Sequence, residues 1–411
     1  MGSVRSIFAL AARNLSRNRR RSLITLLAVF LAVSIVVIVR GGLNALLSSV
    51  EEEIIDGDVG AIQIHRKGFL RSIQTSPLDL DLSAEPTFLN RIRSMPHVKA
   101  VAARIPFGAM VNANDQTVFA RFLGLDPVEE TKVCKMKFQR VVTGHPLQSS
   151  APSGGNLSRL LLQRVKSGVG QSVAVLSNDR DGVMNALDVH VLGSMPDVGM
   201  MAMERKIGWL PLSLSQALLR MPGRATEIAV GVDDRKQIDA VAGRLRTELG
   251  AEFEVSTWRE LVPEVEEVMQ SQDTAVVWVA NIFLLVALIG IANTMQMNVR
   301  ERTREIGTMM AVGVRRYQII QLFTCEAVWI GIFGGLLGVV FGGVVVATLG
   351  SVGIKLRATG GTSVMELRPF VSWLHLVRTF FVAAVGSGVA AFYPAWRASR
   401  LRPVEALARV A

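Results

Sequence analysis

Four stretches of the chain are apolar for long enough to cross a membrane. They cover residues 23–40, 275–297, 319–350 and 372–393. Because about 20 predominantly apolar residues span a bilayer as a helix, we expect four transmembrane helices. We interpret the first run as an uncleaved anchor rather than a signal peptide, because it is longer than the apolar part of a usual signal sequence.

The region between the first and second apolar runs has a different pattern of apolar and polar residues. Residues 57–257 consist of short alternating apolar segments broken by Gly, Pro, Asn and Asp, which is typical of an α+β domain. The strands Val98–Val111 and Thr117–Leu125 are joined by a polar turn and predict a hairpin. The fold class is therefore membrane α-helical with four transmembrane helices, and a large extracytoplasmic α+β domain is inserted between the first two.

Two amphipathic segments flank this predicted domain. Residues 41–56 and 258–274 carry apolar residues at helical spacing among acidic ones, and predict stalks that continue the first two spans. Their apolar residues are candidates for a substrate-contacting surface, with simple packing of the stalks as the alternative. These candidates are Leu43, Leu46, Leu47, Val265 and Met269.

The positive charge is concentrated at the ends of the apolar runs. The chain of 411 residues has a formal net charge of +11. Residues 1–22, 300–316 and 394–411 are rich in arginine, and the rest of the chain is almost neutral. This distribution places these segments in the cytoplasm and is not the pattern of a nucleic-acid-binding face. Residues 1–22 then form an amphipathic elbow, 394–411 a cytoplasmic tail, and 351–371 a short outer loop.

The segment 300–316 lies between the second and third runs. Thr303 is suited to cap a helix there, and Glu305 would lie in its first turn. A helix over residues 304–312 would be only about 13 Å long, with an apolar side that suits a groove in a partner protein. The alternative is a basic loop resting on lipid headgroups. Four residues share the apolar side: Ile306, Met309, Met310 and Gly313.

The third run combines many glycines with a carboxylate. Glycines at four-residue steps predict close packing of helix backbones, since small residues let membrane helices approach each other. These are Gly331, Gly334, Gly335, Gly338 and Gly342, with Gly343 beside them. Glu326 in this run and Asn293 in the second are costly in lipid unless they are paired or face the bundle interior. Each is either a transport residue or a structural hydrogen-bonding residue.

No recognisable catalytic motif accompanies these features. The sequence lacks a phosphate-binding Gly-x-x-x-x-Gly-Lys-Ser/Thr loop, and its five histidines are scattered without metal-ligand spacing. Cys134 and Cys325 lie in regions of different character, so an intrachain disulfide is not expected. We expect no catalytic residue, no metal site and no cofactor bound by this chain.

Two segments of the last part of the chain carry a resemblance to a known family. Residues 293–316, with Glu326-Ala327 beyond them, and residues 393–407 resemble the core and closing motifs of FtsX-type ABC transporter permeases, the type VII group that includes MacB and LolCDE. In the outer domain, residues 122–127, residues 184–193 and Trp258 are similar to the lipoprotein-releasing permeases LolC and LolE. The amino-acid sequence of the charged segment 300–316 resembles that of MacB more closely.

The resemblance implies a permease subunit in the inner membrane of a bacterium, with its large domain in the periplasm. Two such subunits, identical or paralogous, would work with a dimer of a LolD-like ABC ATPase that binds ATP and Mg. The segment 300–316 would be the coupling helix seated in that ATPase. Its implied contact residues are Arg302, Arg304, Glu305, Ile306, Met309, Met310 and Gly313.

For function, the resemblance implies mechanotransmission, in which the ATPase cycle moves the outer domains through the stalks. The expected task is extraction of lipoproteins, or of a lipid, from the inner membrane and their transfer to a periplasmic carrier for the outer membrane. Two alternatives remain: a MacB-like efflux or export permease, and an FtsX-like relay that signals to a cell-wall hydrolase.

Overall fold

The computed structural model describes residues 19–75, 77–141, 143–195, 206–357 and 364–400. Most of the predicted elbow at 1–22 and residues 401–411 of the predicted tail lie outside this range. The chain divides into two compact units. Of the described residues, those within 19–47, 268–354 and 366–400 form a helical unit, and those within 48–267 and 355–365 form a unit with α+β structure.

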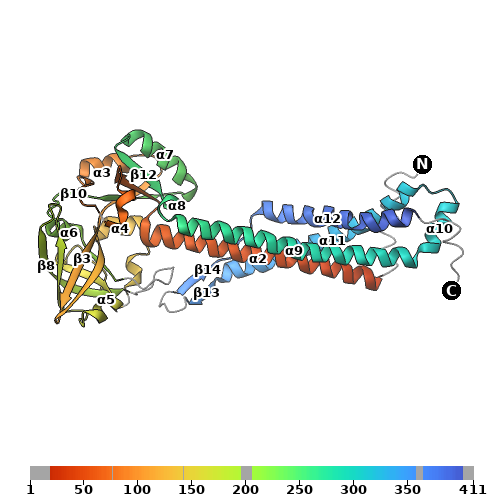
Figure 1. Ribbon diagram of the computed structural model, residues 1–411. Coiled ribbons are helices and arrows are strands. Elements are labelled where there is room, and N and C mark those ends of the chain that lie inside the picture. Colours follow the sequence, from red (N-terminus) through yellow and green to blue (C-terminus); the bar gives the residue numbers. More distant parts are fainter. Residues whose placement is uncertain (1–18, 76, 142, 196–205, 358–363, 401–411) are drawn as a thin grey trace. The chain divides into compact units, whose positions relative to one another are not determined.

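The helical unit contains four helices that are long and apolar enough to cross a membrane. They run alongside one another in Figure 1. A short helix belongs to the same unit, and a strand pair, β13 and β14, lies where the chain passes between the two units near residues 354–367. The bounds are α2 Arg19–Ile54, α9 Pro263–Glu301, α10 Thr303–Ala311, α11 Arg316–Val352, α12 Trp373–Ser399, β13 Ile354–Arg357 and β14 Val364–Leu367.

Helix length accounts for the predicted stalks. α2 has 36 residues and α9 has 39. At 1.5 Å per residue each is over about 50 Å long, whereas the hydrocarbon core of a bilayer is only about 30 Å thick. Each helix is continuous across the boundary between the two units, so residues 41–54 of the predicted first stalk and 263–274 of the second extend the membrane spans, whereas residues 258–261 form a separate short helix. The outer segment at 351–371 contains more structure than the expected loop, because β13 and β14 pair there as a two-stranded sheet.

Glycines line α11 where it meets its neighbours. A Cβ atom added at Gly334, Gly338 or Gly342 would come within 3.0 Å or less of Val29, Val33 or Val37 of α2, respectively. On the other side, a Cβ on Gly331 would meet Ser387 of α12 at 2.8 Å, and one on Gly335 would meet Ala383 at 3.4 Å. Each glycine of the predicted set therefore lies at a close helix approach. Gly343 does not, because no neighbouring atom lies within 4 Å of its Cβ position.

The α+β unit is built on one mixed sheet of ten strands. Its strand order is β12-β1-β11-β3-β4-β9-β6-β8-β5, and β7 pairs with β3 and β8. Most neighbours are antiparallel, whereas β4 with β9 and β6 with β8 are parallel. The strands are β1 Ile62–Arg66, β2 Leu82–Ser83, β3 Val98–Ala113, β4 Gln116–Leu125, β5 Thr143–Gly144, β6 Gly154–Ser158, β7 Ser172–Asn178, β8 Met184–Met195, β9 Ile207–Pro211, β10 Arg224–Ala225, β11 Glu227–Val232 and β12 Phe253–Thr257.

Helices and turns of this unit pack beside the sheet. The predicted hairpin is confirmed: β3 from Arg104 to Ala113 pairs with the whole of β4, and Asn114 and Asp115 have positive φ in the turn between them. The helical elements are the π-helical turn η1 Ile55–Val59, η2 Leu70–Thr75, α3 Pro86–Arg93, α4 Pro127–Val133, η3 Phe138–Arg140, α5 Arg159–Arg164, α6 Leu212–Leu218, η4 Arg235–Gln237, α7 Ile238–Leu249 and α8 Trp258–Leu261.

We predict that Gly338→Ala destabilises the helical unit, whereas Gly343→Ala does not. The new methyl at 338 would meet Val33 Cβ at 2.7 Å and the Phe30 carbonyl oxygen at 2.8 Å, while the one at 343 points into open space. Overpacking of this kind costs about 1–3 kcal/mol. Thermal unfolding of the two variants in detergent measures the difference. Equal melting temperatures would show that α11 does not need its glycines to pack on α2.

Candidate coupling site

The charged segment forms a compact helical turn between α9 and α11. α9 ends at Glu301, and only Arg302, with φ −100° and ψ 14°, separates it from α10. Gly313 has φ +98° and ends the following turn, where its N–H donates to the Met310 carbonyl and the Val314 N–H donates to the Met309 carbonyl. Glycine suits this left-handed position at a helix C-terminus. The segment 300–316 thus consists of the end of α9, α10 and the start of α11, and α10 lies within one residue of the helix expected over 304–312.

Thr303 does not cap α10 as expected. Arg302 occupies the N-cap position, and the Thr303 hydroxyl instead donates to the carbonyls of Val299 and Arg300 in the last turn of α9. Glu305 does lie in the first turn of α10. The interaction that replaces the cap is a common one in helices, in which a threonine hydroxyl donates a hydrogen bond to a backbone carbonyl three or four residues earlier.

The apolar side of α10 faces the chain's own membrane helices. Ile306 is 0% exposed and belongs to a cluster with residues of α2, α9, α11 and α12, including Ile291, Phe323 and Ala395. Met309 and Met310 pack partly buried against the same cluster. The expectation that this side lies in a partner's groove is therefore wrong for Ile306, because burial within the bundle already uses it.

The side of α10 left exposed is polar and cationic, with one apolar residue at its end. Arg304, Thr308 and Gly313 are exposed, and Val312 at the C-cap is 88% exposed. Arg315 and Arg316 follow at the start of α11 and are also exposed. This exposed surface of α10 and its flanks, rather than the apolar stripe, is the part of the segment available to another molecule.

Arg302 ties the α9–α10 junction to α11. Its Nε donates to Glu305 Oε2 at 2.8 Å, its Nη1 lies 3.7 Å from Glu326 Oε2, and its guanidinium lies 5.7 Å from the Phe323 ring centroid. Glu326 is only 3% exposed. Since a buried carboxylate needs a partner, the structure favours the structural alternative for Glu326 over a transport role.

Asn293 differs from the expectation for a polar residue in a membrane helix. It is exposed on α9 and makes no hydrogen bond among the residues that the structure describes. The structural alternative is thus wrong for Asn293 within this chain. The helical period could have predicted that Asn293 is exposed. Ile291 and Met295, two residues before and after it, lie in the buried cluster, so Asn293 faces the other side of α9.

The predicted stalk residues divide by burial. Leu43 and Val265 are buried, which favours packing over substrate contact at these two positions. Leu46, Leu47 and Met269 are half-buried. Within the helical unit, α2 is also joined to α9 by an ion pair between Arg40 and Asp273 and by a hydrogen bond from Thr25 Oγ1 to Thr294 Oγ1 at 3.2 Å.

A buried charge cluster holds the outer end of the first helix within the α+β unit. This joint cluster, which consists of Arg104, Glu130, Lys137 and Glu227, was missed in the sequence because its members are spread over more than a hundred residues. Arg104 makes two hydrogen bonds to Glu130, at 2.7 and 2.8 Å, and one to Glu227 at 2.8 Å. Lys137 Nζ lies 2.6 Å from Glu130 Oε1. Two cations and two carboxylates thus balance in the interior.

The same cations bind the carbonyl groups of η1, the turn that follows α2. Arg104 Nη1 donates to the Val59 carbonyl at 3.0 Å, and Lys137 Nζ donates to the Asp58 carbonyl at 2.9 Å. The Cys134 thiol donates to the Ile55 carbonyl at 3.3 Å. The free carbonyls of a helix end are thereby satisfied by positive groups, which also suit the helix dipole. The end of the first helix is consequently fixed to the core of the sheet.

Electrostatics keep the carboxylates of the joint cluster ionised. Burial alone would raise the pKa of Glu227, but His65, whose Nε2 lies 3.7 Å from Glu227 Oε2, and the charge of Arg104 outweigh it and lower this pKa to about 2. For Glu130, burial likewise opposes ionisation, and Arg104 and Lys137 overcome it, so its pKa is also lowered.

Comparisons with known proteins match both units. A family model described as an FtsX-like permease C-terminal region matches residues 278–403, and one described as a MacB-like periplasmic core domain matches residues 22–248. The latter covers more than half of the chain. In the segments of this unit that resemble LolC and LolE, Phe122, Val189 and Trp258 are buried, whereas Met184 is 67% exposed.

Several proteins are similar over part of their length. An uncharacterised ABC transporter permease of Methanocaldococcus jannaschii is 27% identical over 53% of this chain and 54% of its own length. A macrolide export ATP-binding/permease protein MacB of Marinobacter nauticus is 30% identical over 55% of this chain and 34% of its own. The periplasmic region of MacB from Actinobacillus actinomycetemcomitans covers 53% of this chain and 98% of its own at 14% identity, with a TM-score of 0.36. The chain thus spans about half or less of the full length of the two permeases.

We predict that Ile306→Asp destabilises the chain strongly, whereas Val312→Asp does not. The first buries an unpaired carboxylate in the helix cluster and should cost about 3–5 kcal/mol, whereas the second adds a charge at an exposed position and should cost almost nothing. Thermal unfolding of the purified full chain checks both. If Ile306→Asp unfolds like the wild type, the apolar side of α10 is not seated in the bundle.

We predict that Glu227→Gln changes how stability depends on pH. Because the folded-state pKa of about 2 lies below the unfolded value near 4.5, ionised Glu227 stabilises the fold above pH 4.5, and this contribution is lost as the pH falls through 2. The variant should therefore lose stability at pH 7 and approach the wild type near pH 2. Denaturant titrations across this range measure it.

The matched control is Glu248→Gln, which removes an exposed carboxylate paired with Arg91. We expect this variant to follow the wild-type pH profile closely, because surface pairs contribute little. A stability difference for Glu227→Gln that stays constant between pH 7 and 2 would contradict the assignment.

Proposed function

Since this chain belongs to the MacB/FtsX-type, or type VII, ABC transporter permeases, we propose that it is the membrane subunit through which an ATPase drives an outer domain. The ATPase is an ABC subunit on the cytoplasmic side, which binds ATP and Mg and docks on the exposed surface of α10. Two permease copies, identical or paralogous, flank one ATPase dimer. The complex lies in the bacterial inner membrane, and the α+β unit lies in the periplasm.

The observation that carries this proposal is the way α10 is held. Its apolar side is buried in the helix cluster, while Arg302 connects it to α11 through Glu326. A force on the exposed side therefore acts on α9 and α11 together rather than bending a loose loop. Because four spans alternate in direction, the α+β unit inserted after the first span lies on the opposite side of the membrane from α10.

The path beyond the membrane uses the two continuous helices. α2 passes from the helical unit to η1, where the joint cluster binds the carbonyls of Asp58 and Val59. α9 begins next to α8, whose Thr257–Glu260 capping box closes the sheet's last strand. Both ends of the outer domain are thus attached to membrane helices, which supports mechanotransmission as the mode of action.

For the transported substrate, we favour export of the MacB type. The MacB relatives bear the name macrolide export proteins. Three residues within the segments that resemble LolC and LolE, Phe122, Val189 and Trp258, are buried, so they contribute to the fold of the α+β unit and do not by themselves indicate a substrate. Extraction of lipoproteins for delivery by a periplasmic carrier is the second candidate, motivated by the long exposed apolar face of α9, with Trp278, Ile282 and Val286.

We predict that Val312→Asp releases the ATPase, whereas Val352→Asp does not. Both residues are highly exposed, at 88% and 79%. Val312 lies just before the start of α11, whereas Val352 is the last residue of α11, at the other end of this membrane span. Loss of a central contact residue typically costs over about 2 kcal/mol of binding, or about thirty-fold in affinity. Co-purification of the ATPase with each variant measures this. Retention of the ATPase by Val312→Asp at wild-type level would contradict docking on the exposed surface of α10.

The substrate class is tested with the purified complex of chain and ATPase. Export of the MacB type predicts that ATP hydrolysis rises with a macrolide, and lipoprotein release predicts that it rises with a triacylated lipoprotein. Mass spectrometry of molecules that co-purify gives an independent answer. A response to neither, together with capture of a cell-wall hydrolase by the outer domain, would favour the signalling alternative instead.

A further inference from the structure

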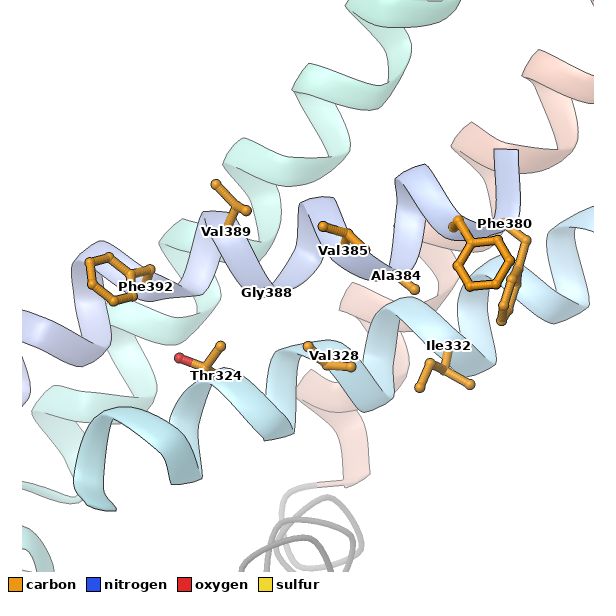
Figure 2. A pocket seen from close by; sticks show the side chains of 10 residues that line it. Thr324, Val328, Ile332, Phe380, Ala384, Val385, Gly388, Val389 and Phe392 are labelled. Atoms are coloured by element: carbon orange, nitrogen blue, oxygen red, sulfur yellow. The ribbon is translucent and has the colours of Figure 1, made fainter. Parts of the chain in front are cut away.

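An apolar groove runs between α11 and α12 inside the helical unit. Its volume is about 730 Å³, within the range of sites that enclose small ligands. Thr324 and Val328 of α11 point towards α12 in Figure 2. Thr324 is the only residue of the lining with a polar side chain. The lining residues are Thr324, Val328, Ile332, Phe380, Phe381, Ala384, Val385, Gly388, Val389 and Phe392.

The groove has the depth of one membrane leaflet. From Phe380 to Phe392, α12 rises about 18 Å, and half of the hydrocarbon core is about 15 Å thick. Its inner end is at Thr324, eight residues or about 12 Å from the start of α11. The groove thus begins in the half of the membrane next to α10 and extends from there along the membrane normal, so an acyl chain whose headgroup lies at the start of α11 can enter it.

Aromatic and cationic residues continue both walls of the groove to the inner surface. On α12, Trp396 and Arg400 follow Phe392 at four-residue steps, so the three residues share one face of the helix. The Arg400 guanidinium lies 4.0 Å from the Trp396 ring centroid. On α11, Tyr317 lies seven residues before Thr324, again on the same face, with the exposed Arg316 beside it. Tyr and Trp rings of this kind sit at the level of lipid headgroups.

We infer that this groove binds a phospholipid of the inner leaflet with an anionic headgroup. One acyl chain lies along Val328, Ile332 and Val385, where only apolar atoms are required. The phosphate and the headgroup lie between the guanidinium groups of Arg316 and Arg400. Within the part of the chain that the structure describes, neither arginine forms an ion pair with a carboxylate, so both positive charges face the headgroup. Charge complementarity selects this occupant over a zwitterionic lipid, since each arginine attracts anionic lipid.

This inference does not depend on the ATPase or on the transported substrate. The groove lies on α11 and α12, and the exposed surface of α10 is a separate set of residues. A lipid seated there would bridge the two helices at the point where a Cβ on Gly388 would meet Val328 at 2.9 Å. Its headgroup chemistry would then influence how firmly α12 packs on α11.

The test is native mass spectrometry of the full chain released from nanodiscs that contain equal amounts of phosphatidylglycerol and phosphatidylcholine. If each arginine favours binding of the anionic lipid about fivefold, the wild type should retain phosphatidylglycerol about 25-fold over phosphatidylcholine. Arg316→Gln combined with Arg400→Gln should bring the two lipids to nearly equal retention. The matched control, Arg300→Gln, removes an exposed arginine at the end of α9 and should keep the preference.

A second pair of variants tests the groove itself. Val385→Trp places a large ring over the groove and should reduce retention of both lipids, whereas Val382→Trp on the same helix should not. Both positions are at least half exposed, at 62% and 50%, so each ring can be accommodated at the helix surface. Thermal unfolding confirms that both variants are folded.

Two outcomes would overturn the inference. Equal retention of the two lipids by the wild type would show that the arginines do not select a headgroup. A disulfide between two copies of a Val385→Cys variant, formed in the membrane, would show that a second copy of the chain covers the groove in place of lipid.

Discussion

The burial of the apolar side of α10 is the constraint on which the rest of the architecture depends. Ile306 belongs to a buried cluster that contains residues from all four long helices, so the short helix is a part of the bundle. Placing a charge-rich segment this way leaves its arginines outward and its hydrophobic residues inward, as the hydrophobic effect requires. Arg302 completes the attachment, because it donates a hydrogen bond to Glu305 and forms a longer ion pair, with 3.7 Å between Nη1 and Oε2, with the buried Glu326.

Two kinds of contact extend this attachment towards the other side of the membrane. Glycine contacts let the α11 backbone approach α2 and α12 closely, where lipid offers no hydrophobic drive for helix association. Polar contacts then join α2 to α9, from Thr25 with Thr294 to Arg40 with Asp273. In the α+β unit, the joint cluster fixes η1 to the sheet. Each link is short and buried or half-buried, which suits the transmission of a small displacement.

The sequence predicts the elements of this account better than their orientation. Four apolar runs, a charged segment and an inserted α+β domain follow from composition and period alone, and the glycine steps indicate close packing. The same period shows that Ile306, Met309 and Met310 share a side of α10, but it does not show what covers that side. An apolar side can be covered by a groove in a partner or by the chain's own bundle, so only the three-dimensional structure distinguishes the two.

The joint cluster could not be predicted for a different reason. Arg104, Glu130 and Glu227 are isolated charges in segments that otherwise resemble ordinary strands and helix ends, and sequence spacing gives no sign that they meet. Arg302 and Glu326 were both singled out, yet their pairing depends on the turn at Gly313 that brings α11 back beside α9. Long-range pairs of this kind require the fold before they can be recognised.

The central claim is that movement at α10 reaches the outer ends of α2 and α9. Spin labels at Gly42 and Ser271, both exposed, report the separation of these two helices in the complex with the ATPase. The account predicts that the distance distribution measured by pulsed electron paramagnetic resonance shifts between the nucleotide-free and the ATP-bound complex. An identical distribution in both states, in a complex that still hydrolyses ATP, would contradict it.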